Sequence, residues 1–388
     1  MGFKFGIDRL GEFRDIFAGK RIGLMTNQTG ITSRYVSTID ALYRQYNLVK
    51  LFAPEHGVRG NLQAGVTLED YRDPATNLPV ISLYGTNRAP QAADLADIDV
   101  FAIDIQDVGA RFYTYLYTMS NIMEACAKAG ITCVVFDRPN PLGSTIEGNI
   151  LDTACQSFIG KFPIPQRYGL TIGECAMLFN HRFDIHCKLV VVPMGDYIPS
   201  QGYKQANMPW IAPSPNIPTA HTCFAYNATC LFEGTNVSEG RGTTQPFSVV
   251  GAPWLAGETL AKVLNALDLP GVYFRPHYFT PMTYHPTSGK YQGQLCGGVE
   301  LMIHSPQIFQ PVATGFAMLY IIRDIAPHDF EFSPPYTPGG KHMIDYNTGN
   351  AFIRTGELSL AEIAYILQQD REIFHSQRQD YLMYPVAR

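Results

Sequence analysis

Residues 100–136 read VFAIDIQDVGARFYTYLYTMSNIMEACAKAGITCVVF, and this stretch decides the fold. Its two ends are short, continuous apolar runs, Val100–Ile105 and Ile131–Phe136, which are typical of strands covered on both faces. The segment between them, Tyr113–Lys128, has helical spacing and is followed by Ala129–Gly130, a common helix stop. A strand, a helix and a strand in this order form a βαβ unit with a right-handed crossover. The stretch therefore predicts a parallel sheet.

The same alternation extends to both sides of this unit. Helical patterns occur at Ser33–Tyr46 and Thr171–His181. Further strand patterns occur at Ile22–Thr26, Leu48–Phe52, Pro79–Leu83 and Lys188–Val192. Repeated βαβ units place helices on both faces of one sheet. We therefore expect a doubly wound α/β fold with a mostly parallel sheet.

The pattern changes in the second part of the chain. Residues 195–222 are rich in proline and polar groups and predict a long ordered surface excursion. A strand is expected at Thr229–Phe232, leading into a glycine-rich loop at 234–246. Beyond it the expected elements, in chain order, are helix Gly257–Leu267, strands Val272–Phe279 and Gly298–Ile303, and helices Val312–Ile325 and Leu358–Tyr381. We place a boundary near residue 246, which gives a larger α/β domain at 1–246 and a smaller α+β auxiliary domain at 247–388.

Composition excludes several classes of function. The 388 residues include 29 basic and 34 acidic ones, and the net charge of −5 leaves no electrostatic footprint for nucleic acid or an anionic membrane surface. The longest apolar stretch, residues 311–322, ends at Arg323 and is too short for a membrane span. In residues 1–20, charged and aromatic residues alternate, and the segment lacks the apolar core of an export signal. A signal removed before residue 1 would leave the same sequence, so the compartment stays open.

Eight cysteines occur in this large chain without a dense spacing pattern. None forms C-x-x-C, so zinc and thioredoxin-like sites lack their usual sequence support. Small core residues with free thiols are the favoured interpretation. One or two disulfides are the alternative that an exported protein would permit.

Polar residues gather where the predicted parallel strands end. Open α/β sheets bind ligands at the carboxyl ends of their strands. Four such loops carry acids, amides or arginines: NQTG at 27–30, APEHGVRG at 53–60, DIQDVGARFYTY at 104–115 and DRPNPLG at 137–143. Four polar loops at the same end of the sheet are hard to explain as solvated turns alone. They predict a polar site at this edge of the sheet.

Individual residues in these loops have two interpretations each. Glu55 and His56 are favoured as proton-transfer groups over loop residues that cap a helix. Asp104 and Asp107 are equally well explained as site acids or as an N-cap and a surface acid. Arg111 is either a ligand-binding residue or the ion-pair partner of one of these acids.

A second polar concentration lies at Glu233–Phe247, EGTNVSEGRGTTQPF. It is either a linker at the domain boundary or a shaped polar site facing the first domain, and the mixed acids with Asn236 and Arg241 favour the site. PSPNIPT at 213–219 adds a rigid backbone and Asn216.

Several familiar chemistries lack their motifs. The sequence has no G-x-G-x-x-G after the first strand, no G-x-x-x-x-G-K-[ST], no H-E-x-x-H and no nucleophile elbow. The histidine pairs at 181/186 and 277/285 lack clear ligand spacing. We therefore predict neither a metal nor an organic cofactor.

Taken together, five motifs in order closely resemble the exo-β-N-acetylmuramidase family of bacterial cell-wall hexosaminidases. They are PEHGVRG, DIQDVGARFYTY, DRPNPLG, PSPNIPT and EGTNVSEGRGTTQPFSVVGAPW. The resemblance implies a Rossmann-like catalytic domain, a smaller C-terminal domain and a cleft between them. It also implies removal of single N-acetylmuramic acid units from non-reducing ends of peptidoglycan fragments. Members of the family are usually exported, so an extracytoplasmic location is expected, with the cytoplasm as the alternative. The family's proposed catalytic glutamate corresponds to Glu55 here.

Glycoside hydrolysis needs an acid for the leaving oxygen and a second group at the anomeric carbon. Glu55 is the candidate acid, with His56 or an apolar wall raising its pKa. The second group is either the substrate's own acetamido oxygen or one of four carboxylates, Asp104, Asp107, Glu233 and Glu239.

Muramic acid carries a lactyl carboxylate, which suits the planar fork of arginine better than lysine. The candidates are Arg59, Arg111 and Arg241. Tyr113 or Tyr115 is expected to offer a face to the sugar ring. Further substrate-binding residues are expected at Asn27, Asn216, Glu233 and Asn236.

A terminal pocket is favoured over an open groove, because a groove usually displays exposed tryptophans and this chain has only Trp210 and Trp254. Two other functions remain open at this stage. One is a non-catalytic muropeptide-binding protein, and the other is a hydrolase of esters or amides on amino sugars.

Overall fold

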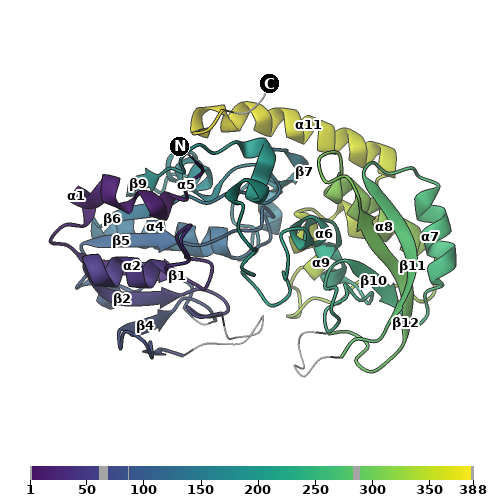
Figure 1. Ribbon diagram of the computed structural model, residues 1–388. Coiled ribbons are helices and arrows are strands. Elements are labelled where there is room, and N and C mark those ends of the chain that lie inside the picture. Colours follow the sequence, from purple (N-terminus) through teal and green to yellow (C-terminus); the bar gives the residue numbers. More distant parts are fainter. Residues whose placement is uncertain (1, 61–68, 86, 283–288, 386–388) are drawn as a thin grey trace.

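The larger sheet of the computed structural model, which describes residues 2–60, 69–85, 87–282 and 289–385, has seven strands in the order β3-β4-β2-β1-β5-β6-β9 (Figure 1). Every neighbouring pair is parallel except β3-β4. The strands are β1 Arg21–Thr26, β2 Asn47–Ala53, β3 Tyr71–Arg72, β4 Pro79–Ser82, β5 Val100–Asp104, β6 Thr132–Phe136 and β9 Lys188–Val192. Numbered among themselves, the six parallel strands run 3-2-1-4-5-6, the order of a doubly wound Rossmann-like sheet. The predicted fold class is confirmed.

Side chains of the central strands alternate between two buried layers, as both-face burial requires. On β5, Phe101 and Ile103 join the apolar cluster that includes α4 (Tyr115–Ala129) and α5 (Ile172–Arg182). Val100 and Ala102 join the opposite cluster. That cluster is covered by η1 Gly6–Phe13, α1 Arg14–Phe17 and α2 Thr38–Gln45.

Local sequence signals set the helix ends. α4 stops at Gly130, whose φ of 69° belongs to the left-handed region that glycine adopts without penalty. α5 begins after Thr171, which forms a capping box with Glu174. The predicted helix from residue 33 was too long at its start, because Ser37 caps α2 by accepting a hydrogen bond from the Asp40 amide at 3.0 Å.

A smaller antiparallel sheet follows, in the order β10-β12-β11. Its strands are β10 Val249–Ala252, β11 Val272–Phe279 and β12 Cys296–Ile303. Helix α7 (Gly257–Asn265) packs against β11 and β12, and α8 (Pro311–Ile325) packs against α7 (Figure 1). The predicted strands and helices match β11, β12, α7 and α8 closely, whereas β10 was not predicted.

The strand predicted at Thr229–Phe232 is wrong. The segment forms the end of α6 (Thr222–Thr229) and the 3-10 helix η4 (Cys230–Gly234). α6 is buried on nearly all sides and packs on α8, where an added Cβ at Gly315 would lie 2.1 Å from the Ala228 carbonyl oxygen. Periodicity cannot separate a short segment of a helix that is buried on all sides from a buried strand.

The two parts of the molecule are joined by late elements of the chain. α11 (Leu360–Arg378) extends over both of them and contacts α8 and the antiparallel pair β7 (Glu147–Ile150) and β8 (Pro165–Arg167) (Figure 1). Tyr384 then donates a hydrogen bond to Asp137 at 2.6 Å, back beside the first sheet. The remaining short elements are α3 Ala92–Leu95, η2 Thr153–Cys155, η3 Pro199–Ala206, α9 Met343–Thr348, α10 Phe352–Thr355 and η5 Gln379–Tyr381. The domain boundary near residue 246 stays a prediction.

All eight cysteines are buried free thiols, which confirms the favoured interpretation of their spacing. Within the described parts of the chain, no helix combines the length and apolar character that crossing a membrane requires.

Candidate active site

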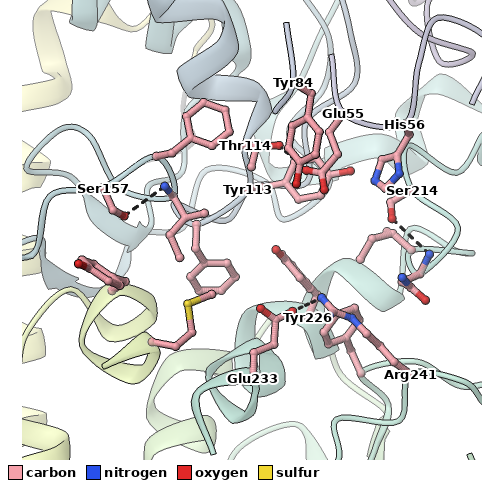
Figure 2. Close-up of a pocket in the computed structure, with 18 of the residues that line it drawn as sticks. Glu55, His56, Tyr84, Tyr113, Thr114, Ser157, Ser214, Tyr226, Glu233 and Arg241 are labelled. Carbon is pink, nitrogen blue, oxygen red and sulfur yellow. Dashed lines mark hydrogen bonds and ion pairs between the residues drawn. The ribbon is translucent and has the colours of Figure 1, made fainter. Parts of the chain in front are cut away.

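A cavity of about 620 Å³ lies where the loops after β2, β4 and β5 meet the second part of the chain. This is the carboxyl edge of the parallel sheet, where open α/β sheets bind their ligands. Figure 2 shows side chains from both parts projecting into it. The residues that line it are Glu55, His56, Tyr84, Arg88, Phe112, Tyr113, Thr114, Ser157, Phe158, Ile159, Ser214, Asn216, Ile217, Tyr226, Glu233, Arg241, Phe247, Tyr336, Met343 and Tyr346.

Glu55 enters the cavity from a tight turn directly after β2. The Gly57 amide donates a hydrogen bond to the Pro54 carbonyl at 3.1 Å. His56, inside this turn, is buried and has a φ of 75°, a conformation that costs energy for a residue with a Cβ. Strain of this kind is concentrated at functional sites. The turn thus fixes the direction in which Glu55 leaves the sheet.

Two hydroxyls from other loops hold the Glu55 carboxylate. Thr114, just before α4, donates a hydrogen bond to Glu55 Oε2 at 2.9 Å. Tyr84, just after β4, hydrogen-bonds to Glu55 as well. Burial and the negative charge of Glu55 together raise the pKa of Tyr84 far above its ordinary value, so that phenol stays a donor. Figure 2 shows Tyr84, Thr114 and Glu55 converging on one side of the cavity.

Aromatic rings form one wall of the cavity, between the Glu55 side and the opposite side. Tyr113 and Tyr226 are in edge contact with ring centroids 5.9 Å apart, and Tyr226 contacts Phe247 in the same way at 4.7 Å. Burial raises the pKa of both tyrosines well above the ordinary value. Neutral, fixed aromatic rings suit the apolar face of a sugar.

The opposite side of the cavity carries Glu233 and Arg241, which form an ion pair (Figure 2). Burial raises the pKa of Glu233, and the charge of Arg241 opposes that rise. Arg241 also lies 3.8 Å from Glu239, which accepts a hydrogen bond from Lys290 at 2.9 Å. The Arg241 guanidinium lies 5.2 Å from the centre of the Phe247 ring. The pair is therefore held by several contacts.

Two predicted acids, Asp104 and Asp107, lie away from the cavity. Asp104 is fully buried and ion-paired with Arg138 at 2.5 Å, and it accepts a short hydrogen bond from Thr38. Asp107 accepts hydrogen bonds from the Tyr168 hydroxyl and the Gly109 amide. Burial raises the pKa of Asp107 to about 6. Both carboxylates stabilise the strand-end loops, which corrects the expectation that they act on substrate.

Two of the three predicted arginines are likewise structural. Arg59 pairs with the buried carboxylate of Asp73 at 2.9 Å. Arg111 is fully buried and donates to the carbonyl oxygens of Asn149 at 2.8 Å, Ile164 at 3.0 Å and Thr348 at 2.8 Å. Neither side chain lines the cavity, so the expected role in binding a lactyl carboxylate is corrected for both.

The predicted amides are divided between two roles. Asn216 lines the cavity. Asn27 is buried and donates a hydrogen bond to the Tyr115 hydroxyl at 2.8 Å. Asn236 donates to the Asp329 carbonyl at 2.7 Å and thereby anchors a loop. Tyr115 itself is fully buried, and its hydroxyl donates to the Pro213 carbonyl at 2.7 Å, so it positions loops and offers no face to a ligand.

Sequence reasoning missed the loop after β4, which brings Tyr84 and Arg88 to the cavity. The signal was present, because Pro79–Leu83 was predicted as a parallel strand and its end must lie beside Glu55. Thr114 was part of the quoted 104–115 motif but received no role. Contributions from residues 336–346 had no local signal, since the tertiary fold alone brings them there.

Among the described residues, no group of three or more His, Cys, Asp or Glu side chains is arranged to hold a metal ion. From its own residues, the site can provide proton transfer to and from a bound ligand by carboxyl groups on opposite sides of the cavity.

Comparison with known proteins gives full-length matches. Residues 22–221 match the family model described as exo-beta-N-acetylmuramidase NamZ, N-terminal, and residues 224–384 match its C-terminal counterpart. The peptidoglycan beta-N-acetylmuramidase NamZ of Bacillus subtilis (strain 168) is 44% identical over 386 residues, covering 98% of this chain and 91% of the relative.

Two crystal structures of DUF1343 family proteins from Bacteroides fragilis NCTC 9343 are also similar. One has a TM-score of 0.89 and 35% identity, with 99% of each chain covered. The other has a TM-score of 0.80 and 30% identity, with 100% of each chain covered.

Proposed function

This chain belongs to the exo-β-N-acetylmuramidase NamZ family, and on that premise we propose that it is a glycoside hydrolase that releases N-acetylmuramic acid units from non-reducing ends of peptidoglycan fragments. The observation that carries the proposal is the cavity with Glu55 and Glu233 on opposite sides. Its volume of about 620 Å³ is that of a pocket for a small ligand. Glycosidases characteristically place two carboxyl groups on either side of the scissile bond.

We propose that Glu55 is the acid. It transfers its proton to the glycosidic oxygen while the bond between that oxygen and the anomeric carbon breaks, and the bonding electrons stay with the leaving oxygen. The hydrogen bonds from Thr114 and Tyr84 orient the carboxyl group for this transfer. His56 belongs to the strained turn that presents Glu55 and acts as a positioning residue.

We propose Glu233 as the second group, because it is the other carboxylate among the described residues that line the cavity. Its ion pair with Arg241 favours the ionised form, which can accept a proton. Water then attacks the anomeric carbon and gives its proton to Glu233, which completes the addition of one water molecule.

The product anomer tests this assignment of Glu233. Water attack assisted by Glu233 inverts the β-glycoside, so the first NMR spectra of the released sugar should show the α-anomer. Early appearance of the β-anomer would instead assign the attack to the acetamido oxygen of the substrate or to an enzyme nucleophile.

The exo mode is tested on short glycan chains. From chains ending in N-acetylmuramic acid, mass spectrometry of early samples should detect that sugar as the single small product. Chains capped by a non-reducing N-acetylglucosamine should stay intact, because a pocket excludes an internal sugar. Fragments of two or more disaccharides from capped chains would contradict the pocket, and binding without any product would identify a muropeptide-binding protein instead.

We further propose that the enzyme acts outside the cytoplasm, where intact peptidoglycan is found. Cell fractionation of the source organism with an antibody to this chain is the test, and recovery in the cytosolic fraction alone would contradict it.

A further inference from the structure

Among the described residues, the Glu233 side of the cavity contains no surplus positive charge for an anionic ligand. Arg241 contacts Glu233 and Glu239, and Lys290 pairs with Glu239. The cluster thus holds two carboxylates and two cations, whose formal charges cancel. Arg241 was one of the residues expected to bind a lactyl carboxylate, but its guanidinium is already engaged by protein carboxylates.

Arg88 lines the same cavity and is arranged differently. Its guanidinium carbon lies 4.2 Å from the centre of the Phe158 ring, and the side chain is exposed. The Asn121 side-chain amide donates a hydrogen bond to the Arg88 carbonyl at 2.9 Å, which holds the backbone in place. Across the described parts of the chain, no carboxylate lies within ion-pair distance of this guanidinium. Arg88 is thus a positioned cation whose charge is available to a ligand.

A guanidinium stacked on an aromatic ring keeps its N–H edge open, and that edge matches the two oxygens of a carboxylate. Phe158 and Ile159, both half-buried, line the cavity next to Arg88 and offer apolar surface. The charge of Arg88 also reaches Tyr84, where it opposes the rise in that phenol's pKa. Arg88 therefore lies on the Glu55 side of the cavity.

The lactyl ether of N-acetylmuramic acid consists of a carboxylate and a methyl group on one carbon. N-acetylglucosamine has a hydroxyl at the same ring position and carries neither group. An arginine beside an apolar surface matches both features of the lactyl group at once. We infer that Arg88 is the specificity-determining residue that binds the lactyl carboxylate, with the lactyl methyl against Phe158 and Ile159. This inference rests on the proposed function and deepens it.

The first experiment measures binding, because binding does not depend on turnover. The ligands are N-acetylmuramic acid, its lactyl methyl ester and N-acetylglucosamine, titrated by calorimetry. Wild-type protein should bind the acid at least about tenfold more tightly than the ester, as expected for charge-assisted hydrogen bonds. Arg88→Gln should lower the affinity for the acid to that for the ester and leave the other two ligands within twofold.

Three further variants control this result. Arg88→Lys keeps the charge but loses the fork, so it should recover part of the affinity. Arg34→Gln removes an exposed arginine outside the cavity and should change nothing. Arg241→Gln should lower the affinity for all three ligands by a similar factor.

The second experiment measures turnover of chromogenic glycosides of the two sugars. Arg88→Gln should lower kcat/KM for the muramic glycoside by about 30–100-fold and leave that for the glucosaminide within twofold.

The inference is overturned if Arg88→Gln binds the acid as tightly as wild type, or if all three ligands weaken equally. It is also overturned if Arg241→Gln alone removes the preference for the acid. A wild-type protein that binds the acid through Arg88 but hydrolyses neither glycoside would refute the proposed function and leave this inference standing.

Discussion

At the scale of single residues, the site depends on how one carboxylate is held. Glu55 receives a hydrogen bond from Thr114 and another from Tyr84, and these two residues follow different strands of the sheet. The carboxylate thus has a fixed direction before any substrate arrives. Preorganisation of this kind affects the chemical step more than binding.

Replacement of the acid should therefore cause a large loss of activity. Glu55→Gln removes the transferable proton with little change in shape, so we expect the fold to persist and activity on the natural disaccharide to fall by roughly two to four orders of magnitude. Glycosides with a good leaving group need less protonation and should be affected less. Steady-state kinetics on both substrates checks this, and a variant retaining more than about a tenth of the wild-type rate would show that another residue is the acid.

The role of Thr114 can be separated from that of the acid. Thr114→Val keeps the shape and removes the donor to Glu55, so kcat should fall by about tenfold while KM changes little. Thr114→Ser should restore most of the rate. Thr118→Val is the matched control, because the Thr118 hydroxyl donates to the backbone carbonyl of Thr114 and leaves the Thr114 hydroxyl free to donate to Glu55. Equal losses in Thr114→Val and Thr118→Val would indicate a general effect on α4.

At the scale of elements, the strand-end loops serve two purposes. Some direct side chains into the cavity, and others hold the two parts of the molecule together. Arg111 belongs to the second group, since its guanidinium donates to carbonyls at 149, 164 and 348. Burial lowers its pKa to about 10, which leaves it charged at neutral pH.

Loss of Arg111 should cost stability rather than specificity. Arg111→Met leaves several buried carbonyls without a donor, so we expect the free energy of unfolding to fall by about 3 kcal/mol. Urea unfolding measures this, with Arg34→Gln, which should change stability by less than about 0.5 kcal/mol, as control. The folded variant should keep its preference for the muramic glycoside. Loss of that preference at wild-type stability would show that Arg111 takes part in substrate binding.

The strands and their end loops also show how far the sequence could predict the site. All six parallel strands were predicted within a residue or two, because burial on both faces produces short, continuous apolar runs that few other structures share. The pairing of charges was not predictable. Asp104 and Arg111 are close in sequence, yet Asp104 pairs with Arg138 and Arg111 meets carbonyls from distant segments. Such choices depend on which side chains the tertiary fold brings together.

At the scale of the whole molecule, buried carboxyl groups make stability depend on pH. Burial raises the pKa of Asp107 and Asp137 to about 6 and that of Glu147 and Glu174 to about 7. In the unfolded chain these groups titrate near about 4. The folded state therefore binds more protons between about pH 4 and 7, and the free energy of unfolding falls as the pH rises through that window. Asp73 and Asp99, whose pKa values are lowered, act in the opposite direction below about pH 4.

Urea unfolding should thus show a lower stability at pH 8 than at pH 5. Glu147→Gln should reduce this difference, because glutamine can still accept the hydrogen bond from the Ala313 amide and carries no charge at either pH. Exposed Glu357→Gln is the control and should leave the difference unchanged. Identical pH dependence in wild type and Glu147→Gln would mean that Glu147 titrates alike in both states.

The bond from Tyr384 to Asp137 has a consequence for synthesis of the protein. The two residues are 247 positions apart, so at roughly 5–20 residues per second Asp137 leaves the ribosome about 12–50 s before its partner does. During that interval the first sheet has a buried carboxylate that lacks one of its donors. We expect nascent chains arrested near residue 246 to be cleaved by protease faster than the same segment in the released protein.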